Sequence, residues 1–185
     1  KSNLKHKIAG KETVKIYEQM KNHSEAIKLM IDTLTHKDYG VISSMSEISA
    51  VGHRVVHGGE TFSGSILIDD NVIKAIQENA ELAPLHNPAN LMGIRACQEI
   101  MPGAKMAAVF DTAFHQTMPE VAYLYAIPYE MYTEKKIRKY GFHGSSHRYV
   151  AQKAAQMLGK PLEELKLINC HLGNGSSICA IDKGK

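Results

Sequence analysis

Short apolar runs alternate along this chain with segments of helical periodicity, and this alternation constrains the fold more than any other feature. Helical spacing of apolar residues begins near Ser24 and again near Asp69. Strand-like runs occupy Ile48 to His57 and Ala104 to Phe110. Strands that alternate with helices indicate an α/β fold.

Local signals predict where several elements begin and end. Asn87 is placed to be an N-cap with Pro88 as the first helical residue, and that helix should stop at Pro102-Gly103. A serine at 145 or 146 should cap a helix that ends at Gly159. The apolar runs on either side of Gly-Asn-Gly 173–175 predict a hairpin, and Asn-Gly favours a type I′ turn.

Composition excludes some classes of function. The 185 residues carry a net charge of +3 without a run of five basic residues, so we expect no nucleic-acid partner. No apolar stretch approaches the roughly 20 residues of a membrane helix. The N-terminal residues lack the apolar core of a signal peptide. The 3 cysteines form no CxxC motif, which favours a reducing, cytoplasmic location.

The strand-like segment 51–60 places side chains on two faces. Arg54 and Val56 share one face, and His53, Val55 and His57 share the other. A cation beside an apolar side chain suits a small amphipathic anion, although an edge-strand arginine in a salt bridge has the same pattern. The two histidines would lie about 13 Å apart on a strand, too far to share a metal, which favours structural roles for them.

Asp111 and His86 are further candidates for chemistry. Asp111 ends an apolar strand, and ligand sites of open α/β sheets lie at the carboxyl ends of strands. An aspartate there can hold Mg²⁺ through water or orient a nucleophile; the alternative is an Asx turn or helix cap. His86 lies in a loop bounded by prolines, where a structural hydrogen bond is the simpler interpretation.

Two glycine-rich segments complete the candidates. Glycines flank His143, which allows a backbone to approach a ligand closely. His147 lies one helical turn further on, but no carboxylate or thiol at suitable spacing completes a zinc site. The N–H groups and hydroxyls between His171 and Ser177 suit phosphate, although the segment is not a P-loop and can equally be a plain hairpin turn.

Taken together and in this order, five segments resemble the successive signatures of the acetate kinase family, a branch of the acetate and sugar kinase, heat-shock chaperone and actin superfamily. They are GHRVVHGGE, APLHNPAN, VFDTAFHQTMP, YGFHGSSH and INCHLGNGSS. The resemblance implies α/β, incomplete ribonuclease H-like domains. Residues 1–115 would belong to the N-terminal, substrate-side domain, and residues 116–185 would begin the nucleotide-binding domain.

The resemblance also assigns roles to residues of this sequence. The catalytic residues would be Asp111, His143 and His86. Arg54 would bind the carboxylate or phosphoryl group, and the pocket for the acetate methyl would be lined by Val56, Leu85 and Phe142. The turn that holds the ATP phosphates would consist of His171, Leu172, Gly173, Asn174 and Gly175.

The implied reaction is the reversible, Mg²⁺-dependent transfer of the γ-phosphoryl group of ATP to acetate, giving acetyl phosphate and ADP, in a homodimer. No metal ligand is assigned within this segment. Ser145 replaces the usual threonine of the family and keeps its hydroxyl. The opening strand, a second arginine, the adenine pocket and a metal-binding glutamate of the family have no counterpart here. We therefore expect an excised segment that is inactive alone.

Three other interpretations remain open at this point. A propionate kinase of the same family is one, although the resemblance associates a valine at position 56 with acetate. A binding module without chemistry is the second, and it would not need Asp111 and His143. A chaperone-like or actin-like interaction protein is the third, and it would lack the pocket formed by Arg54, Val56 and Phe142.

Overall fold

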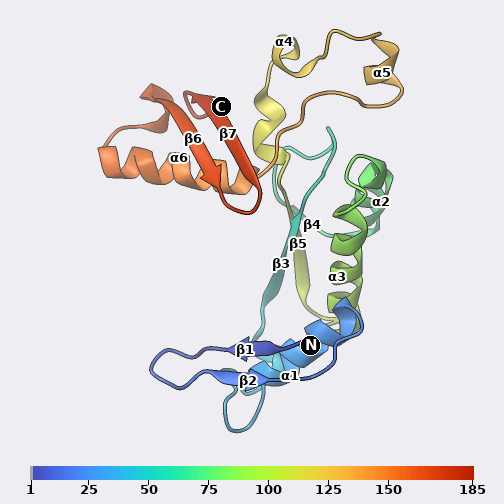
Figure 1. Cartoon of the computed structure of the whole chain (residues 1–185), viewed down its shortest axis with the longest axis vertical. Coiled ribbons are helices and arrows are strands. Elements are labelled where there is room, and N and C mark those ends of the chain that lie inside the picture. Colours follow the sequence, from blue (N-terminus) through green and yellow to red (C-terminus); the bar gives the residue numbers. More distant parts are fainter. Residues whose placement is uncertain (1) are drawn as a thin grey trace.

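The computed structural model describes residues 2–185. In Figure 1, a three-stranded sheet occupies the middle, a small hairpin and a helix lie at one end, and a helix with a second hairpin lies at the other. The strands are β1 (Leu4–His6), β2 (Val14–Ile16), β3 (Ala50–Val55), β4 (Ile66–Leu67), β5 (Lys105–Phe110), β6 (Lys166–Leu172) and β7 (Ser176–Asp182). The α-helices are α1 (His23–Leu34), α2 (Asp70–Glu78), α3 (Asn87–Ile100), α4 (Glu120–Tyr123), α5 (Glu130–Thr133) and α6 (Gly144–Leu158).

The central sheet has the order β3-β5-β4 and confirms the predicted α/β class. Strands β3 and β5 are parallel, with Ala50 opposite Lys105 and Val55 opposite Phe110. The short strand β4 pairs antiparallel with β5. Because β3 and β5 run in the same direction and in register, the residues that follow them, Val56 and Asp111, meet at one edge of the sheet.

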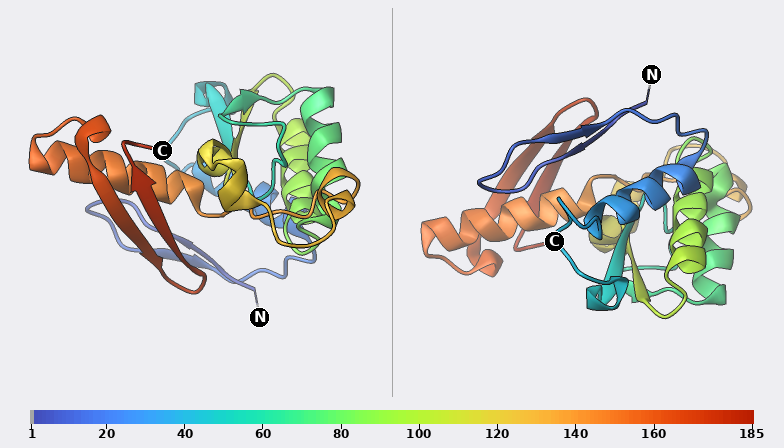
Figure 2. Two further views of the ribbon diagram at one scale, coloured as in Figure 1. Left: turned by 90° about the horizontal axis from the view of Figure 1, so that it is seen from above. Right: turned by 90° about the horizontal axis from the view of Figure 1, so that it is seen from below.

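Helices α2 and α3 cover one face of this sheet and bury the main core. Both views of Figure 2 show these helices on one side of the molecule, while α6 and its hairpin extend away from them. The phenyl rings of Phe62 and Phe110 stack with centroids 4.5 Å apart. The buried apolar residues of this cluster are Val55, Phe62, Val72, Ile76, Leu91, Ile94, Ala108 and Phe110.

A second, smaller cluster joins α1 to α3 and β5 through Ile31, Cys97, Met101 and Met106. Helix α1 begins with Asn22, whose side chain accepts a hydrogen bond from the N–H of Glu25. The strands β1 and β2 form a separate antiparallel hairpin. Among residues 2–185, none of the helices combines the length and the apolar character that crossing a membrane requires.

The prediction that Asn87 caps α3 is wrong. Asn87 is the first residue of the helix, and the cap position belongs to His86, which makes no side-chain capping bond. The Asn87 amide instead bridges to β3: its Oδ1 accepts from the N–H of His57 at 3.1 Å, and its Nδ2 donates to the His57 carbonyl at 3.0 Å. Asn87 is fully buried, so it fixes the start of α3 against the end of β3.

The predicted hairpin is confirmed as β6 and β7, with Leu172 opposite Ser176. Its turn is not type I′, because that turn needs positive φ at both central residues, and among the described residues neither Asn174 nor Gly175 has positive φ. The three residues 173–175 form a longer connection, which leaves their N–H groups at an exposed tip. Asn169 on β6 ties this hairpin to α6 by donating to the carbonyl of His147 at 2.8 Å.

Candidate active site

Arg54 and Asp111 form a bidentate ion pair at the carboxyl ends of β3 and β5. Arg54 Nε donates to Asp111 Oδ1 at 3.0 Å, and Nη2 donates to Oδ2 at 2.6 Å. The hydrogen bonds to Asp111 raise the pKa of Arg54. The Asp111 side chain is 2% exposed, whereas that of Arg54 is 63% exposed. Both carboxylate oxygens of Asp111 therefore accept hydrogen bonds from the guanidinium of Arg54, and the rest of the guanidinium faces solvent.

The edge-strand salt bridge, one of the two interpretations of Arg54 from sequence, is thus present. This salt bridge is compatible with the other interpretation, that Arg54 binds a small anion, because the exposed part of the guanidinium can still receive one. Asp111 makes neither the Asx turn nor the helix cap that we considered as alternatives. Its carboxylate acts on Arg54.

The backbone of Asp111 also fixes the segment that carries His143. Its N–H donates to the Val55 carbonyl at 2.9 Å, and its carbonyl accepts from the N–H of Gly144 at 2.9 Å. A Cβ at position 144 would lie 2.3 Å from that carbonyl oxygen, so only glycine permits this approach. Strand β5 and the start of α6 are therefore held together next to the ion pair.

His143 occupies the position before α6 in a left-handed conformation, with φ 56° and ψ 27°. The predicted serine cap is wrong, since α6 begins at Gly144 and its cap residue is His143, without a side-chain capping bond. The imidazole is instead held from β7 and β6. Its Nδ1 lies 2.9 Å from Ser177 Oγ, and its ring stacks on that of His171 with centroids 4.1 Å apart. Left-handed residues other than glycine are uncommon and concentrate at functional sites.

Burial and neighbouring histidines favour the neutral forms of His143, His147 and His115. Burial lowers the pKa of His143, and the adjacent His171 lowers it further. Burial also lowers the pKa of His147 and of His115. A neutral imidazole has one N–H donor and one bare nitrogen acceptor, so the tautomer decides which edge donates.

The Gly173–Gly175 turn lies against the edge of His143. A Cβ on Gly175 would be 3.4 Å from both Nε2 and Cε1 of His143, which is a tight contact. The neighbouring His171 is fixed by Ser146, whose Oγ lies 2.9 Å from its Nδ1. The turn that was expected to hold phosphate and the histidine that was expected to stabilise transferred charge are thus neighbours.

Phe142 packs on a buried histidine, and Val56 is held by α3. The rings of Phe142 and His57 meet edge-on with centroids 5.7 Å apart. Val56 continues β3, and its N–H donates to Asn90 Oδ1 on α3 at 3.1 Å. The carbonyl of Phe142 lies 2.9 Å from His115 Nε2.

His57 was assigned only a structural role from the sequence, and its position explains what it supports. It is 1% exposed and packs on Tyr140 as well as Phe142. Its Nδ1 accepts from the N–H of Gly59 at 3.0 Å, as a neutral imidazole can. The only signal in the sequence was its place on the same strand face as buried Val55.

Leu85 and His86 lie at the surface, in the loop that precedes α3. The Leu85 side chain is 85% exposed, and His86 is also exposed. Both residues precede Asn87, whose bonds to His57 hold their loop beside the end of β3.

Arg138 anchors the loop between α5 and α6, and no local pattern in the sequence marks it as important. Its side chain is 4% exposed, bonds to Glu60 at 2.5 Å and lies 3.6 Å from the centre of the Tyr123 ring. Burial and the charge of Glu60 raise the pKa of Tyr140 to about 12. This cluster connects the Gly58-Gly59-Glu60 turn to the segment that precedes Phe142.

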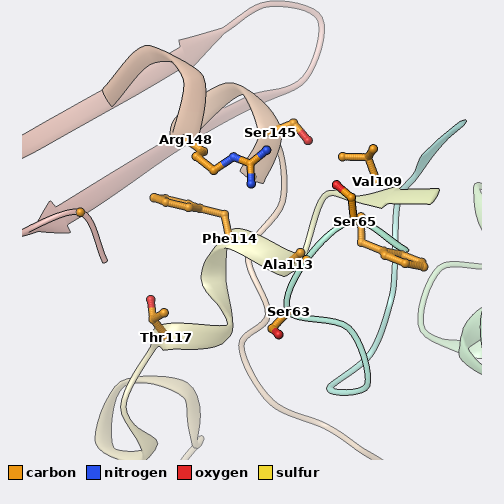
Figure 3. Close-up of a pocket in the computed structure, with 12 residues that line it drawn as sticks. Ser63, Ser65, Val109, Ala113, Phe114, Thr117, Ser145 and Arg148 are labelled. Atoms are coloured by element: carbon orange, nitrogen blue, oxygen red, sulfur yellow. The ribbon is translucent and has the colours of Figure 1, made fainter. Parts of the chain in front are cut away.

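A pocket of about 150 Å³ lies on another side of the α6 N-terminus. Figure 3 shows Arg148 and Phe114 on one side of it and Ser63 and Ser65 on the other. Arg54, Val56, Phe142 and His143 lie outside this pocket. Phe142 lines a different hollow, together with His57 and Tyr140.

Residues 2–185 contain no group of three or more His, Cys, Asp or Glu side chains placed to hold a metal ion. At the strand ends, both carboxylate oxygens of Asp111 are bonded to Arg54.

The fold is α/β, and an arginine anchored by a buried carboxylate, a group of histidines and a glycine turn lie at its strand ends, where such groups can bind an anion. The family model of the acetokinase family matches residues 1–185. The chain therefore belongs to the acetokinase family. It is 63% identical over 182 residues to an acetate kinase of Caldanaerobacter subterraneus and 65% identical over 182 residues to one of Thermoanaerobacterium thermosaccharolyticum.

These alignments include 98% of this chain and 45% of each of those two relatives, so the chain spans under half the length of the curated relatives it matches. Solved structures agree. The acetate kinase of Porphyromonas gingivalis superposes with a TM-score of 0.92 at 48% identity, over 99% of this chain and 46% of that one. A propionate kinase of Francisella tularensis gives 0.86 at 44% identity, over 94% and 43%.

The buried His57 predicts a pH dependence of stability. Burial lowers its pKa from 6.5 to about 4, so the unfolded chain binds this proton more readily. The stabilisation is complete above pH 6.5 or so and is lost as the pH falls toward about 4; at pH 5 the loss amounts to about 2 kcal/mol. We expect the free energy of unfolding, measured with urea at pH 8 and at pH 5, to fall by about 2 kcal/mol less in His57→Gln than in the unaltered protein. The matched control His23→Gln, at an exposed histidine, should leave the pH dependence unchanged; equal pH dependence in His57→Gln and the unaltered protein would contradict the assignment.

Proposed function

We propose that this chain provides part of an acetate kinase site, which transfers the γ-phosphoryl group of ATP to acetate and forms acetyl phosphate and ADP. The observation that carries the proposal is the Arg54–Asp111 pair next to His143 and the Gly173–Gly175 turn. Phosphoryl transfer needs positioning and charge neutralisation more than covalent chemistry, and these groups are suited to that.

Arg54 binds the carboxylate or the transferred phosphoryl group through the exposed part of its guanidinium. Asp111 orients Arg54 and does not act as a base. Carboxylic acids have pKa values near 4 or so, hence acetate is already ionised at pH 7 and no proton has to be removed. The two-pronged bond between the side chains supports this role.

His143 donates a hydrogen bond to the oxygens of the transferred group, where negative charge develops. The backbone N–H groups of the His171–Gly175 turn, which includes Leu172 and Asn174, hold the phosphates of ATP. Val56, Leu85 and Phe142 enclose the acetate methyl, and His86 borders the same surface. Leu85 would have to turn inward, because it is 85% exposed here.

The wider setting belongs to the same proposal. Residues 1–115 form part of the substrate-side domain, and residues 116–185 begin the nucleotide-binding domain. Mg²⁺ accompanies the nucleotide and neutralises its phosphates, with ligands outside the described residues. The enzyme is a homodimer, and the free thiols of Cys97, Cys170 and Cys179 suit a reducing, cytoplasmic location.

The direct test is an acetate kinase assay on a full-length family protein that contains these residues. Acetyl phosphate formed from acetate, ATP and Mg²⁺ would be trapped with hydroxylamine and measured. We expect Asp111→Asn to lower kcat about 100-fold or more, because Arg54 loses its anchor. The loss should be the same from pH 6 to pH 8. A loss that disappears at either end of this range would contradict orientation and indicate acid or base catalysis.

Val56 should control the choice between acetate and propionate. One methylene in an apolar pocket changes the free energy of the transition state by about 1–3 kcal/mol. Val56→Ala should therefore raise kcat/KM for propionate relative to acetate by roughly tenfold. The matched control is Val51→Ala, earlier on β3, which should leave the ratio unchanged. An unchanged ratio in Val56→Ala would remove Val56 from the pocket.

A further inference from the structure

Ser177 lies between two histidines and bonds to both. Its Oγ is 2.9 Å from His143 Nδ1 and 2.7 Å from His147 Nε2. A serine hydroxyl has one proton and two acceptor lone pairs, so when both imidazoles are neutral it can donate to one ring and accept from the other. In that arrangement the three side chains form one directed chain of hydrogen bonds, and the proton position on one ring is linked to that on the other.

The inner end of this chain is His147. It lies on α6 with 2% exposure, and burial lowers its pKa. The outer end is His143, whose pKa is also lowered and whose Nδ1 is already committed to Ser177. The other nitrogen of His143, Nε2, is the one beside Gly175. The bond between Ser177 and Nδ1 therefore determines whether Nε2, which faces the glycine turn, carries a proton.

The two possible directions of the chain have different chemical consequences. If Ser177 donates to Nδ1, neutral His143 carries its proton on Nε2 and presents a donor at the turn. If His143 donates from Nδ1, Nε2 is a bare acceptor. Phosphoryl oxygens accept hydrogen bonds, so a bare Nε2 would repel them, and only the first direction stabilises transferred charge.

We propose that Ser177 is a positioning residue that accepts a hydrogen bond from His147 Nε2–H and donates its own to His143 Nδ1, so that His143 presents Nε2–H at the Gly173–Gly175 turn. The direction of this chain rests on the proposed function. The sequence had marked the Ser177 hydroxyl only as part of a phosphate-binding turn. Its bonds here direct it to the histidines.

Several charged or titratable groups act on this chain from the surrounding elements. His171 on β6 lies against both histidines of the chain, and His115, in the turn after β5, lies against His147. Asp111 favours the protonated form of His143, and Arg54 opposes it. The groups to consider in any pH profile are therefore His115, His143, His147, His171, Asp111 and Arg54.

The direct test is the tautomer of His143 in the full-length protein. Histidine ¹⁵N labelling and long-range ¹⁵N–¹H correlation spectra at pH 8 distinguish Nε2–H from Nδ1–H, and His143→Gln assigns the signal. We expect Nε2–H in the unaltered protein and a mixture of tautomers in Ser177→Ala. An Nδ1–H tautomer, or no change in Ser177→Ala, would overturn the proposal. This readout needs no turnover, so it separates failure of this inference from failure of the kinase proposal.

Kinetics give a second test. Ser177→Ala should lower kcat about tenfold at pH 8, because Nε2 then donates only part of the time. The ratio of the two kcat values should approach one as the pH falls below the His143 pKa, because an imidazolium has N–H on both nitrogens. Ser177→Thr keeps the hydroxyl and should restore activity. A loss that is independent of pH would overturn the proposal.

Asn169→Ala is the matched structural control. It removes the hydrogen bond from β6 to the His147 carbonyl and so loosens the same contact between helix and hairpin. It leaves both imidazole rings bonded to Ser177. We expect a lower Tm with any loss of kcat independent of pH. A pH profile like that of Ser177→Ala would mean that loosened packing, not the tautomer, explains both variants.

Discussion

The ion pair between Arg54 and Asp111 is the interaction on which the rest of the site depends. Parallel pairing of β3 and β5 in register brings the two residues to one edge of the sheet. The guanidinium of Arg54 neutralises the buried carboxylate of Asp111. The backbone carbonyl of Asp111 accepts a hydrogen bond from the N–H of Gly144. A single residue therefore positions both the arginine and the helix that His143 precedes. Removing one partner of such a pair leaves a buried charge without compensation, which is a large cost.

The histidines around this pair work as neutral groups. Burial lowers the pKa of His57, His115, His143 and His147. Neutral rings avoid adding charge repulsion to a crowded cluster, and each retains one N–H for a directed hydrogen bond. The arrangement makes hydrogen-bond direction, rather than net charge, the property that the surrounding serines and backbone groups have to control.

Much of the fold follows from local signals in the sequence. The apolar run ending at Phe110 and the glycine turn between two strands were sufficient to predict β5 and the hairpin. The errors share one cause. Asn87, Ser145 and Asn174 have side chains or dihedral preferences that suit a cap or a tight turn locally, but tertiary contacts determine what happens there. Asn87 bonds to β3, and His143 takes the cap position of α6 because β7 and β6 hold its ring.

The candidate site could be predicted only in part for the same reason. Arg54 and Asp111 were recognisable because each follows the periodicity of a strand and stands at its end. Ser177 and Arg138 were not, because their importance lies in partners 30 or more residues away. Local patterns identify which side chains point out of a strand, whereas long-range pairing identifies which of them meet.

A double-mutant cycle between Arg54→Ala and Asp111→Asn, measured as kcat/KM for acetate in the full-length protein, tests the central claim most directly. If Asp111 works by holding Arg54, it has nothing left to hold once the arginine is gone. The double variant should then be within about threefold of Arg54→Ala alone, which corresponds to strong coupling between neighbouring sites. Losses that simply multiply would contradict the account and give Asp111 an independent part in the chemistry.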